Sequence, residues 1–236
     1  MSKPDLSGKL ALITGASRGI GAAVALGMAE AGAHVIALAR TTGGLEALDD
    51  KIRNVGGKAT LLPLNLAHLD EIDKLGPTLA ERFGRLDIFV GNAGVLGPLS
   101  PVGHIKAKDW EKVFKINFMA NVRLVQTLDP LLRASEAGRV VFTTSDIADE
   151  APAYWGGYAA SKSALNTFMR TYAAETEKTN MRINAIHPGA VQTAMMTEAF
   201  PGGPSFKLKT PEQVVNDYLA IVANNCPHHG QIIKLP

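Results

Sequence analysis

Short, β-rich apolar runs alternate with longer helical patterns along almost the whole chain. The runs predicted as strands are residues 10–14, 34–39, 59–64, 86–90, 139–144, 182–186 and 231–235. The helical patterns lie at residues 19–31, 45–54, 69–83, within 107–134, and at 157–177 and 211–223. Apolar strands separated by helices form a parallel sheet covered on both faces. The sequence therefore predicts an α/β protein: a single-domain, doubly wound Rossmann fold over residues 1–236, with a parallel sheet of about seven strands.

Composition narrows the class of protein. Hydrophobic residues make up 46% of the 236 residues and the net charge is +2, so we expect a packed core and no nucleic acid or anionic membrane as partner. The first six residues have no apolar signal-peptide core, and no apolar run approaches the roughly 18 residues that span a bilayer. Because Cys226 is the only cysteine, no intrachain disulfide can form. The simplest interpretation is a cytoplasmic protein.

A glycine-rich turn follows the first predicted strand, where an open α/β sheet binds its ligands. Residues 14–21 read TGASRGIG and open a helix. Glycines let a phosphate approach the backbone, and the helix N-terminus supplies free N–H groups. The spacing differs from G-x-G-x-x-G and alone also fits a turn that merely packs helix on strand. Its place on the first βα turn favours nucleotide binding by Gly15, Ser17, Arg18, Gly19, Ile20 and Gly21.

The end of the second predicted strand indicates which dinucleotide binds. Arg40 lies 19 residues after Gly21, and no acid occurs between Ala33 and Leu45. An acid there would hold the ribose hydroxyls of NAD(H), whereas an arginine pairs with the 2′-phosphate of NADP(H). Arg18 adds a second positive charge. We predict NADP(H) as the preferred cofactor, with NAD(H) as the alternative; the other interpretation of Arg40 is a solvated surface arginine.

Tyr158 and Lys162 lie four residues apart on a predicted helix, and Ser145 closes the fifth strand. They can meet at the carboxyl edge of the sheet. A lysine ammonium about 4 Å from the phenol, at an effective dielectric near 20, offers roughly 4 kcal/mol toward phenolate. That equals roughly 3 pKa units, opposed by desolvation. Each residue alone could be structural. Together they predict proton transfer to a substrate oxygen, which Ser145 would hydrogen-bond.

In this order and spacing, the motifs resemble the short-chain dehydrogenase/reductase family over about residues 6–235. The matching parts are residues 14–21, Asn92-Ala93-Gly94, Asn117, Ser145, Tyr158, Lys162 and Pro188-Gly189. The resemblance implies an oxidoreductase that transfers a hydride between NADP(H) and a small-molecule carbonyl or secondary alcohol.

The resemblance also implies individual roles. Tyr158 would be the general acid/base, and Lys162 would hold the nicotinamide ribose and lower the tyrosine pKa. Ser145 would orient the substrate, and Asn117 would anchor a proton-relay water near Lys162. The remaining cofactor-binding residues implied are Asn92, Ala93, Gly94, Pro188, Gly189, Val191 and Thr193.

The sequence departs from the family pattern at two positions. Asn65, followed by Leu66, stands where the family usually has an aspartate that contacts adenine. An amide oxygen can still accept from the adenine amine, so we keep both as cofactor-binding residues. His187 stands where asparagine is common, and we expect it only to cap the turn.

Residues 191–210 resemble a substrate lid, and Trp155 would form another wall of the pocket. The apolar side chains of Met195, Met196, Phe200 and Phe206 fit two interpretations equally: contact with a partly apolar substrate, or packing of the lid on the body.

The sequence also leads to expectations about the oligomeric state, metal binding and an alternative function of the protein. We expect a homodimer through the helices that carry Asn117 and Tyr158; a tetramer is less expected because the chain lacks the glycine-ended tail of many relatives. Cys226, His228 and His229 lack a fourth ligand and ordinary zinc spacing, so we expect no metal. A non-catalytic nucleotide-binding sensor or scaffold is the alternative function.

Overall fold

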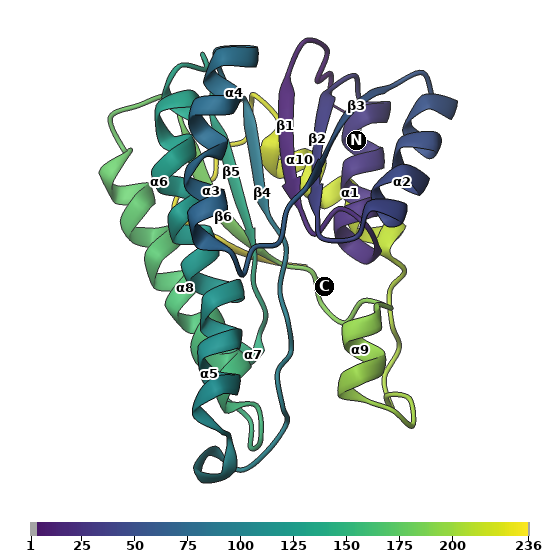
Figure 1. Cartoon of the computed structure of the whole chain (residues 1–236), viewed down its shortest axis with the longest axis vertical. Helices are drawn as coiled ribbons and strands as arrows, with labels where there is room; N and C mark the ends of the chain where they lie inside the picture. The colour runs from purple at the N-terminus through teal and green to yellow at the C-terminus, as the bar shows by residue number, and fades with distance from the viewer. Residues whose placement is uncertain (1–3, 236) are drawn as a thin grey trace.

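Seven parallel strands form one sheet in the order β3-β2-β1-β4-β5-β6-β7 in this computed structural model, which describes residues 4–235 (Figure 1). Residues 1–3, part of the segment predicted to lack a signal peptide, and residue 236 lie outside the described part. The strands are β1 (Leu10–Thr14), β2 (His34–Ala39), β3 (Lys58–Pro63), β4 (Ile88–Gly91), β5 (Arg139–Thr143), β6 (Arg182–His187) and β7 (Ile232–Lys234). The predicted doubly wound fold is confirmed. Strand order reverses between β1 and β4, which makes their carboxyl ends the topological switch point.

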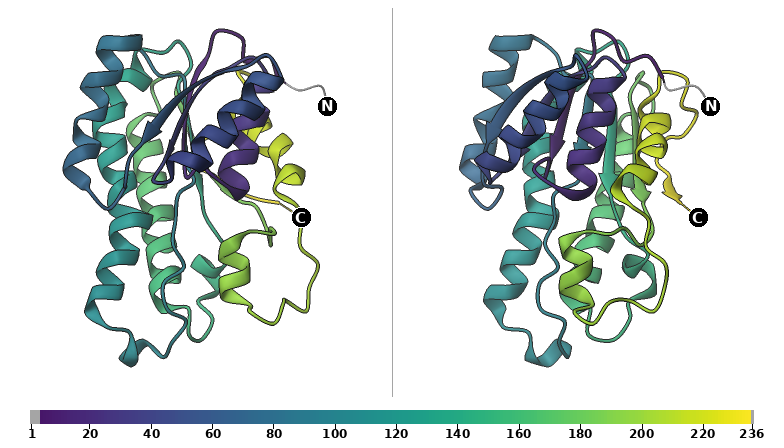
Figure 2. Two further views of the ribbon diagram at one scale, coloured as in Figure 1. Left: turned by 45° about the vertical axis from the view of Figure 1, so that its right-hand side comes forward. Right: turned by 90° about the vertical axis from the view of Figure 1, so that its right-hand side faces the viewer.

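Helices cover both faces of this sheet (Figures 1 and 2). One face packs against α1 (Gly19–Glu30), α2 (Thr42–Asn54) and α10 (Val215–Val222). The other packs against α4 (Leu75–Phe83), α6 (Ala120–Arg133) and α8 (Gly156–Glu175). Alternate residues of β1 enter the two cores: Ala11 and Ile13 one, Leu10 and Leu12 the other. Among residues 4–235, no helix is long and apolar enough to cross a membrane.

Two predicted helices are interrupted. The pattern at residues 69–83 forms α3 (Leu69–Asp73) and α4, because Gly76 packs closely on α6: its amide donates to Thr127 Oγ1 over 3.0 Å. The long helix within residues 107–134 consists of α5 (Ala107–Phe114), a π turn (Lys115–Met119) and α6. The short helices α7 (Ile147–Glu150) and α9 (Ala194–Ala199) were not predicted, since neither is long enough to show a helical period.

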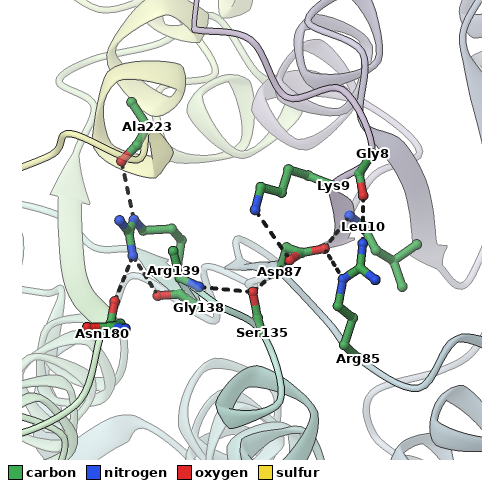
Figure 3. A network of polar contacts seen from close by, with 11 residues as sticks. Gly8, Lys9, Leu10, Arg85, Asp87, Ser135, Gly138, Arg139, Asn180 and Ala223 are labelled. Carbon is green, nitrogen blue, oxygen red and sulfur yellow. Dashed lines mark hydrogen bonds and ion pairs between the residues drawn. The ribbon is translucent and has the colours of Figure 1, made fainter.

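Helices α5, α7 and α9 extend beyond the carboxyl ends of the strands and surround the predicted ligand edge (Figures 1 and 2). The opposite edge holds a buried polar network instead (Figure 3). There Asp87 accepts from the Leu10 amide over 2.9 Å, from Ser135 Oγ over 2.6 Å and from Arg85 Nε over 3.3 Å. This network ties the start of β1 to the segments that precede β4 and β5, and it leaves the carboxyl edge for chemistry.

Candidate functional site

The glycine turn forms a cradle that only small residues fit. Gly15 and Gly19 have φ of +69° and +57°, in the left-handed region that favours glycine. A Cβ on Gly21 would overlap the Gly15 carbonyl oxygen and lie 2.6 Å from Asn92 Nδ2. Within the described residues, the side chain of the N-cap Arg18 makes no capping hydrogen bond and the first turn of α1 holds no acid. The α1 amides are therefore available to an anion, which fits a dinucleotide phosphate.

Asn92 ties the ends of β1 and β4 together at the switch point. Its Nδ2 donates to the Thr14 carbonyl over 3.0 Å, and Thr14 Oγ1 accepts from the Asn92 and Ala93 amides over 3.0 Å each. A Cβ on Gly94 would lie 3.3 Å from Asn117 Oδ1 and 3.7 Å from Lys162 Nζ. The predicted Asn-Ala-Gly turn therefore lies beside the glycine cradle and beside Lys162.

The predicted adenine side of the site is more open. Arg18 and Arg40 are both exposed, so both guanidinium groups can reach a phosphate in solvent. Asn65 Oδ1 already accepts from the Ala67 amide over 3.1 Å, which leaves it one further acceptor position for an adenine amine. Leu66 is buried in the core on the α4 and α6 side.

The π turn presents Asn117 to the site. Asn117 is fully buried: its Oδ1 accepts from the Val95 amide over 2.8 Å, and its Nδ2 donates to the Val95 carbonyl and to Ser161 Oγ over 3.0 Å each. The Asn117 carbonyl accepts from Asn121 Nδ2 over 2.9 Å. The side chain thus holds the segment after Gly94 against α8. The predicted role as a water anchor stays a prediction.

Tyr158, Lys162 and Ser145 converge as predicted from their spacing. Lys162 Nζ lies 5.8 Å from the centre of the Tyr158 ring and donates to the Thr143 carbonyl over 2.7 Å. Ser145 lies two residues after the end of β5, near enough to Tyr158 to influence its pKa. All three therefore face one another at the carboxyl edge of the sheet.

The electrostatics differ from the expectation for Tyr158. Burial raises the pKa of Tyr158 to about 12; the hydrogen bond with Ser145 lowers it, and the charge of Asp146 raises it further. Burial lowers the pKa of Lys162 to about 8. Desolvation of Tyr158 outweighs the other influences on its pKa. The Lys162 ammonium donates to the Thr143 carbonyl, and its predicted effect on the tyrosine pKa stays a prediction.

Two supporting residues were missed at the sequence level. Tyr218, fully buried on α10, hydrogen-bonds Thr143 Oγ1 over 2.8 Å, and Thr143 in turn holds Lys162 through its carbonyl. Ser161 Oγ joins Asn117 to α8 and donates to the Tyr158 carbonyl over 2.8 Å. Ser161 stands beside Lys162 in the sequence, but Tyr218 has no such signal, and the contacts of both with Thr143 and Asn117 join distant parts of the chain.

The two ends of the predicted lid, residues 191–210, pair with each other, and one end lies beside the glycine cradle. Val191 pairs with Lys209 in an isolated parallel bridge, so the two ends of the lid are joined. Thr193 caps α9, and its Cγ2 would lie 3.3 Å from a Cβ on Gly19. Gly189 has φ of +77° and directs the chain from Pro188 into this bridge. The predicted cofactor-binding residues Val191 and Thr193 therefore lie at the end of the lid that approaches the glycine cradle.

Aromatic rings line the space between the lid and Tyr158. The Trp155 ring centre lies 6.1 Å from that of Tyr158 and 6.2 Å from that of Phe200, and Phe206 lies 5.5 Å from Phe200. Trp155 follows Tyr154, whose φ of +76° is strained for a side chain of this size. Met195 and Met196 are half-buried on α9.

The histidines after α10 have structural partners. His229 Nδ1 accepts from the Ile183 amide over 3.2 Å, and Nε2 contacts the Ala173 carbonyl over 2.8 Å. Among residues 4–235, no three metal-ligating side chains gather. His187 accepts from the Gly189 amide at Nδ1 over 3.4 Å, which matches the predicted turn cap.

Comparisons with known proteins agree with this geometry. The sequence profile of the family described as short chain dehydrogenase matches residues 9–202. An uncharacterized oxidoreductase, YciK, of Escherichia coli K12 is 36% identical over 93% of this chain and 88% of its own. The 3-oxoacyl-[acyl-carrier-protein] reductase FabG of Thermotoga maritima is 30% identical over 98% and 97%. A solved short chain dehydrogenase from Escherichia coli CFT073, complexed with NADPH, has a TM-score of 0.92 at 34% identity and 99% coverage of both chains.

Proposed function

This chain belongs to the short-chain dehydrogenase/reductase family of oxidoreductases, and from that premise we propose that it transfers a hydride between NADP(H) and a carbonyl or secondary-alcohol substrate. The observation that carries the proposal is the convergence of Ser145, Tyr158 and Lys162 at the carboxyl edge, beside a glycine cradle that fits a dinucleotide phosphate.

The cofactor in this proposal is NADP(H), held by the cradle of Gly15, Gly19 and Gly21 and by the exposed Arg18 and Arg40. The NADPH complex of a similar protein supports the choice. When bound, NADPH supplies the hydride. NAD(H) remains the alternative, and tighter binding of NADH than of NADPH would favour it.

The chain's own residues handle the proton. With a pKa of about 12, Tyr158 keeps its phenolic hydrogen at neutral pH and can donate it to a carbonyl oxygen. Ser145 Oγ donates a second hydrogen bond to the same oxygen as negative charge develops there. Lys162 uses one hydrogen for Thr143, which leaves two for a cofactor hydroxyl and a proton-relay water at Asn117. Its positive charge stabilises the phenolate left on Tyr158.

The substrate in this proposal is partly apolar. Trp155, Phe200 and Phe206 form a continuous aromatic wall from Tyr158 to the lid. Such a wall favours an apolar group next to the reacting carbonyl, because burying it removes apolar area from water. Residues 191–210 would cover that group as a lid.

The test is NADPH oxidation with a panel of ketones and aldehydes that carry aliphatic or aromatic groups. Tyr158→Phe should lower kcat roughly 100- to 10,000-fold, the range of general acid catalysis, and leave NADPH binding unchanged. Tyr154→Phe is the matched control: this exposed tyrosine four residues earlier should keep wild-type turnover. Wild-type turnover in Tyr158→Phe would refute the mechanism. NADPH binding without turnover of any panel compound would favour a sensor or scaffold.

The proposed assembly is a homodimer through α5, α6 and α8, and the proposed location is the cytoplasm. Met119, between α5 and α6, is an exposed apolar side chain on that surface. Light scattering after gel filtration measures the mass and tests the dimer.

A further inference from the structure

Asp146 directly follows Ser145 and accepts the hydrogen of its hydroxyl group. Ser145 Oγ donates to Asp146 Oδ1 over 3.0 Å, and the same oxygen accepts from the Ile147 amide over 2.8 Å. Asp146 is the N-cap residue of α7, so the cap holds the carboxylate beside Ser145. A hydroxyl has a single hydrogen to donate. The hydrogen that a substrate oxygen needs is therefore directed at Asp146.

His187 approaches the other oxygen of that carboxylate. Its Nε2 lies 3.5 Å from Asp146 Oδ2. Because the Gly189 amide donates to Nδ1, the neutral ring carries its hydrogen on Nε2, which faces Asp146. The His187 side chain is 12% exposed and that of Asp146 is 42% exposed. The half-buried ring at the end of β6 and the turn at Gly189 thus give the carboxylate a partner opposite Ser145.

Charged groups from several elements act on His187. Burial is the largest effect and lowers the pKa of His187. The negative charges of Asp146 and Glu150, at the two ends of α7, raise that pKa, whereas the positive charges of Lys234 on β7 and Lys209 at the end of the lid lower it. Lys234 also pairs with Asp149 over 3.2 Å. At neutral pH the His187 ring is therefore predominantly uncharged.

The same charge acts on the general acid. Asp146 raises the pKa of Tyr158 through its negative charge. The other titratable groups that face Tyr158 are Lys162 on its own helix and Tyr218 on α10. A negative group so close to a forming phenolate and a forming substrate oxyanion opposes both.

We propose that Asp146 and His187 form a positioning pair that competes with the substrate for the hydrogen of Ser145. The proposal deepens the proposed function and rests on it. While His187 is neutral, Asp146 holds Ser145 away from the substrate oxygen. Protonation of His187 pairs its imidazolium with the carboxylate, which becomes a weaker acceptor for the Ser145 hydroxyl and leaves that hydrogen to the substrate. Substrate affinity therefore rises as the pH falls below the usual histidine range.

The first experiment needs no substrate. The titration of His187 is followed by NMR of its imidazole and assigned with His187→Gln among the six histidines. Asp146→Asn keeps the helix cap, because an amide oxygen still accepts from Ile147, but should lower the His187 pKa by roughly half a unit or more through loss of the charge. Asp149→Asn removes the same charge from the same helix. It acts on His187 only through its partner Lys234, so it should lower that pKa by less than Asp146→Asn does. An unchanged His187 pKa in Asp146→Asn overturns the pair.

The second experiment uses a substrate from the carbonyl panel. A neutral amide is a weaker acceptor, so KM at neutral pH should fall about 3- to 10-fold in Asp146→Asn and stay at the wild-type value in Asp149→Asn. The KM of the wild type should decrease as the pH is lowered and His187 becomes protonated. The KM of His187→Gln should not change with pH, because glutamine keeps a hydrogen-bond donor that cannot titrate. If the KM of Asp146→Asn is equal to or above that of Asp149→Asn, Asp146 does not compete with the substrate for the hydrogen of Ser145.

The two proposals fail differently. If no carbonyl compound is reduced, the proposed function fails and the competition fails with it. If an active enzyme shows no response of KM to Asp146→Asn, only the positioning pair is wrong. A purely structural role of Asp146 would change stability but would leave KM independent of pH in wild type and His187→Gln alike.

Discussion

Replacing Lys162 with methionine should stabilise the cofactor-free protein while abolishing turnover. Lys162 is 3% exposed, and burial lowers its pKa from 10.5 to about 8. At about 1.4 kcal/mol per pKa unit, holding the ammonium here costs about 3 kcal/mol at pH 7. Methionine has a similar length and no charge. It leaves the Thr143 carbonyl without its donor, however, and the lost hydrogen bond lowers the stability by about 1 kcal/mol. We expect a net gain of about 2 kcal/mol at pH 7.

The pH dependence separates this effect from ordinary packing. The unfolded lysine keeps its proton up to 10.5 and the folded one loses it above about 8, so the unfolded state binds more protons between these values. Wild-type stability should therefore rise with pH across that window. Near pH 10 the cost of the buried charge falls to about 1 kcal/mol, and the advantage of Lys162→Met should vanish. Tyr158, with its pKa raised from 10.0 to about 12, acts with the opposite sign and only above pH 10.

Urea unfolding at pH 7 and pH 10, followed by circular dichroism, measures both values. Lys115→Met is the matched control, because Lys115 is exposed on the π turn and should change stability by no more than about 0.5 kcal/mol. Loss of stability in Lys162→Met at pH 7, or an equal gain at both pH values, would refute the reasoning. Turnover of NADPH should be lost at either pH.

Three further predictions concern the cradle, the cofactor and the opposite edge. Gly21→Ala should abolish NADPH binding, measured by cofactor fluorescence, because its Cβ overlaps the Gly15 carbonyl; Gly43→Ala, whose Cβ meets no described atom within 4 Å, should bind normally. Arg40→Ser should weaken NADPH binding roughly 10-fold or more, as loss of a charged hydrogen bond does, with little effect on NADH; equal weakening of both would contradict a 2′-phosphate contact. Asp87→Ala should lower the free energy of unfolding by about 3–5 kcal/mol, since it orphans several buried donors, with no change in KM; a loss under about 1 kcal/mol would show that water replaces the carboxylate.

The periodic and local features of the sequence predicted the fold well. Apolar runs bounded by helical patterns identified every strand, because a strand buried on both faces must be apolar throughout. Helices α7 and α9 and the π turn at Asn117 were missed, since a single turn leaves no periodic trace. The break before α4 was missed because its cause is a contact with Thr127, far along the chain.

In the candidate site, too, residues in local sequence patterns were predicted and residues joined by long-range contacts were missed. Ser145, Tyr158 and Lys162 were placed together by spacing and by the rule that ligands bind at the carboxyl edge. Tyr218 was not, because it reaches Thr143 from a helix that the sequence separates from β5 by many residues. Asp146 was overlooked beside Ser145 since only the fold brings His187 to its other oxygen.

The sequence by itself determined the fold class, the glycine-rich turn and the proximity of Tyr158 and Lys162, because these depend on local patterns and short spacings. Only the tertiary structure decided how those residues behave. It desolvates Tyr158, which raises the pKa of that tyrosine, and the charge of Asp146 raises it further. It also buries Lys162, which lowers the pKa of that lysine, and directs its ammonium at the Thr143 carbonyl. The reason is physical: desolvation and long-range charge depend on what surrounds a group in space, and the linear spacing of two residues carries no record of either.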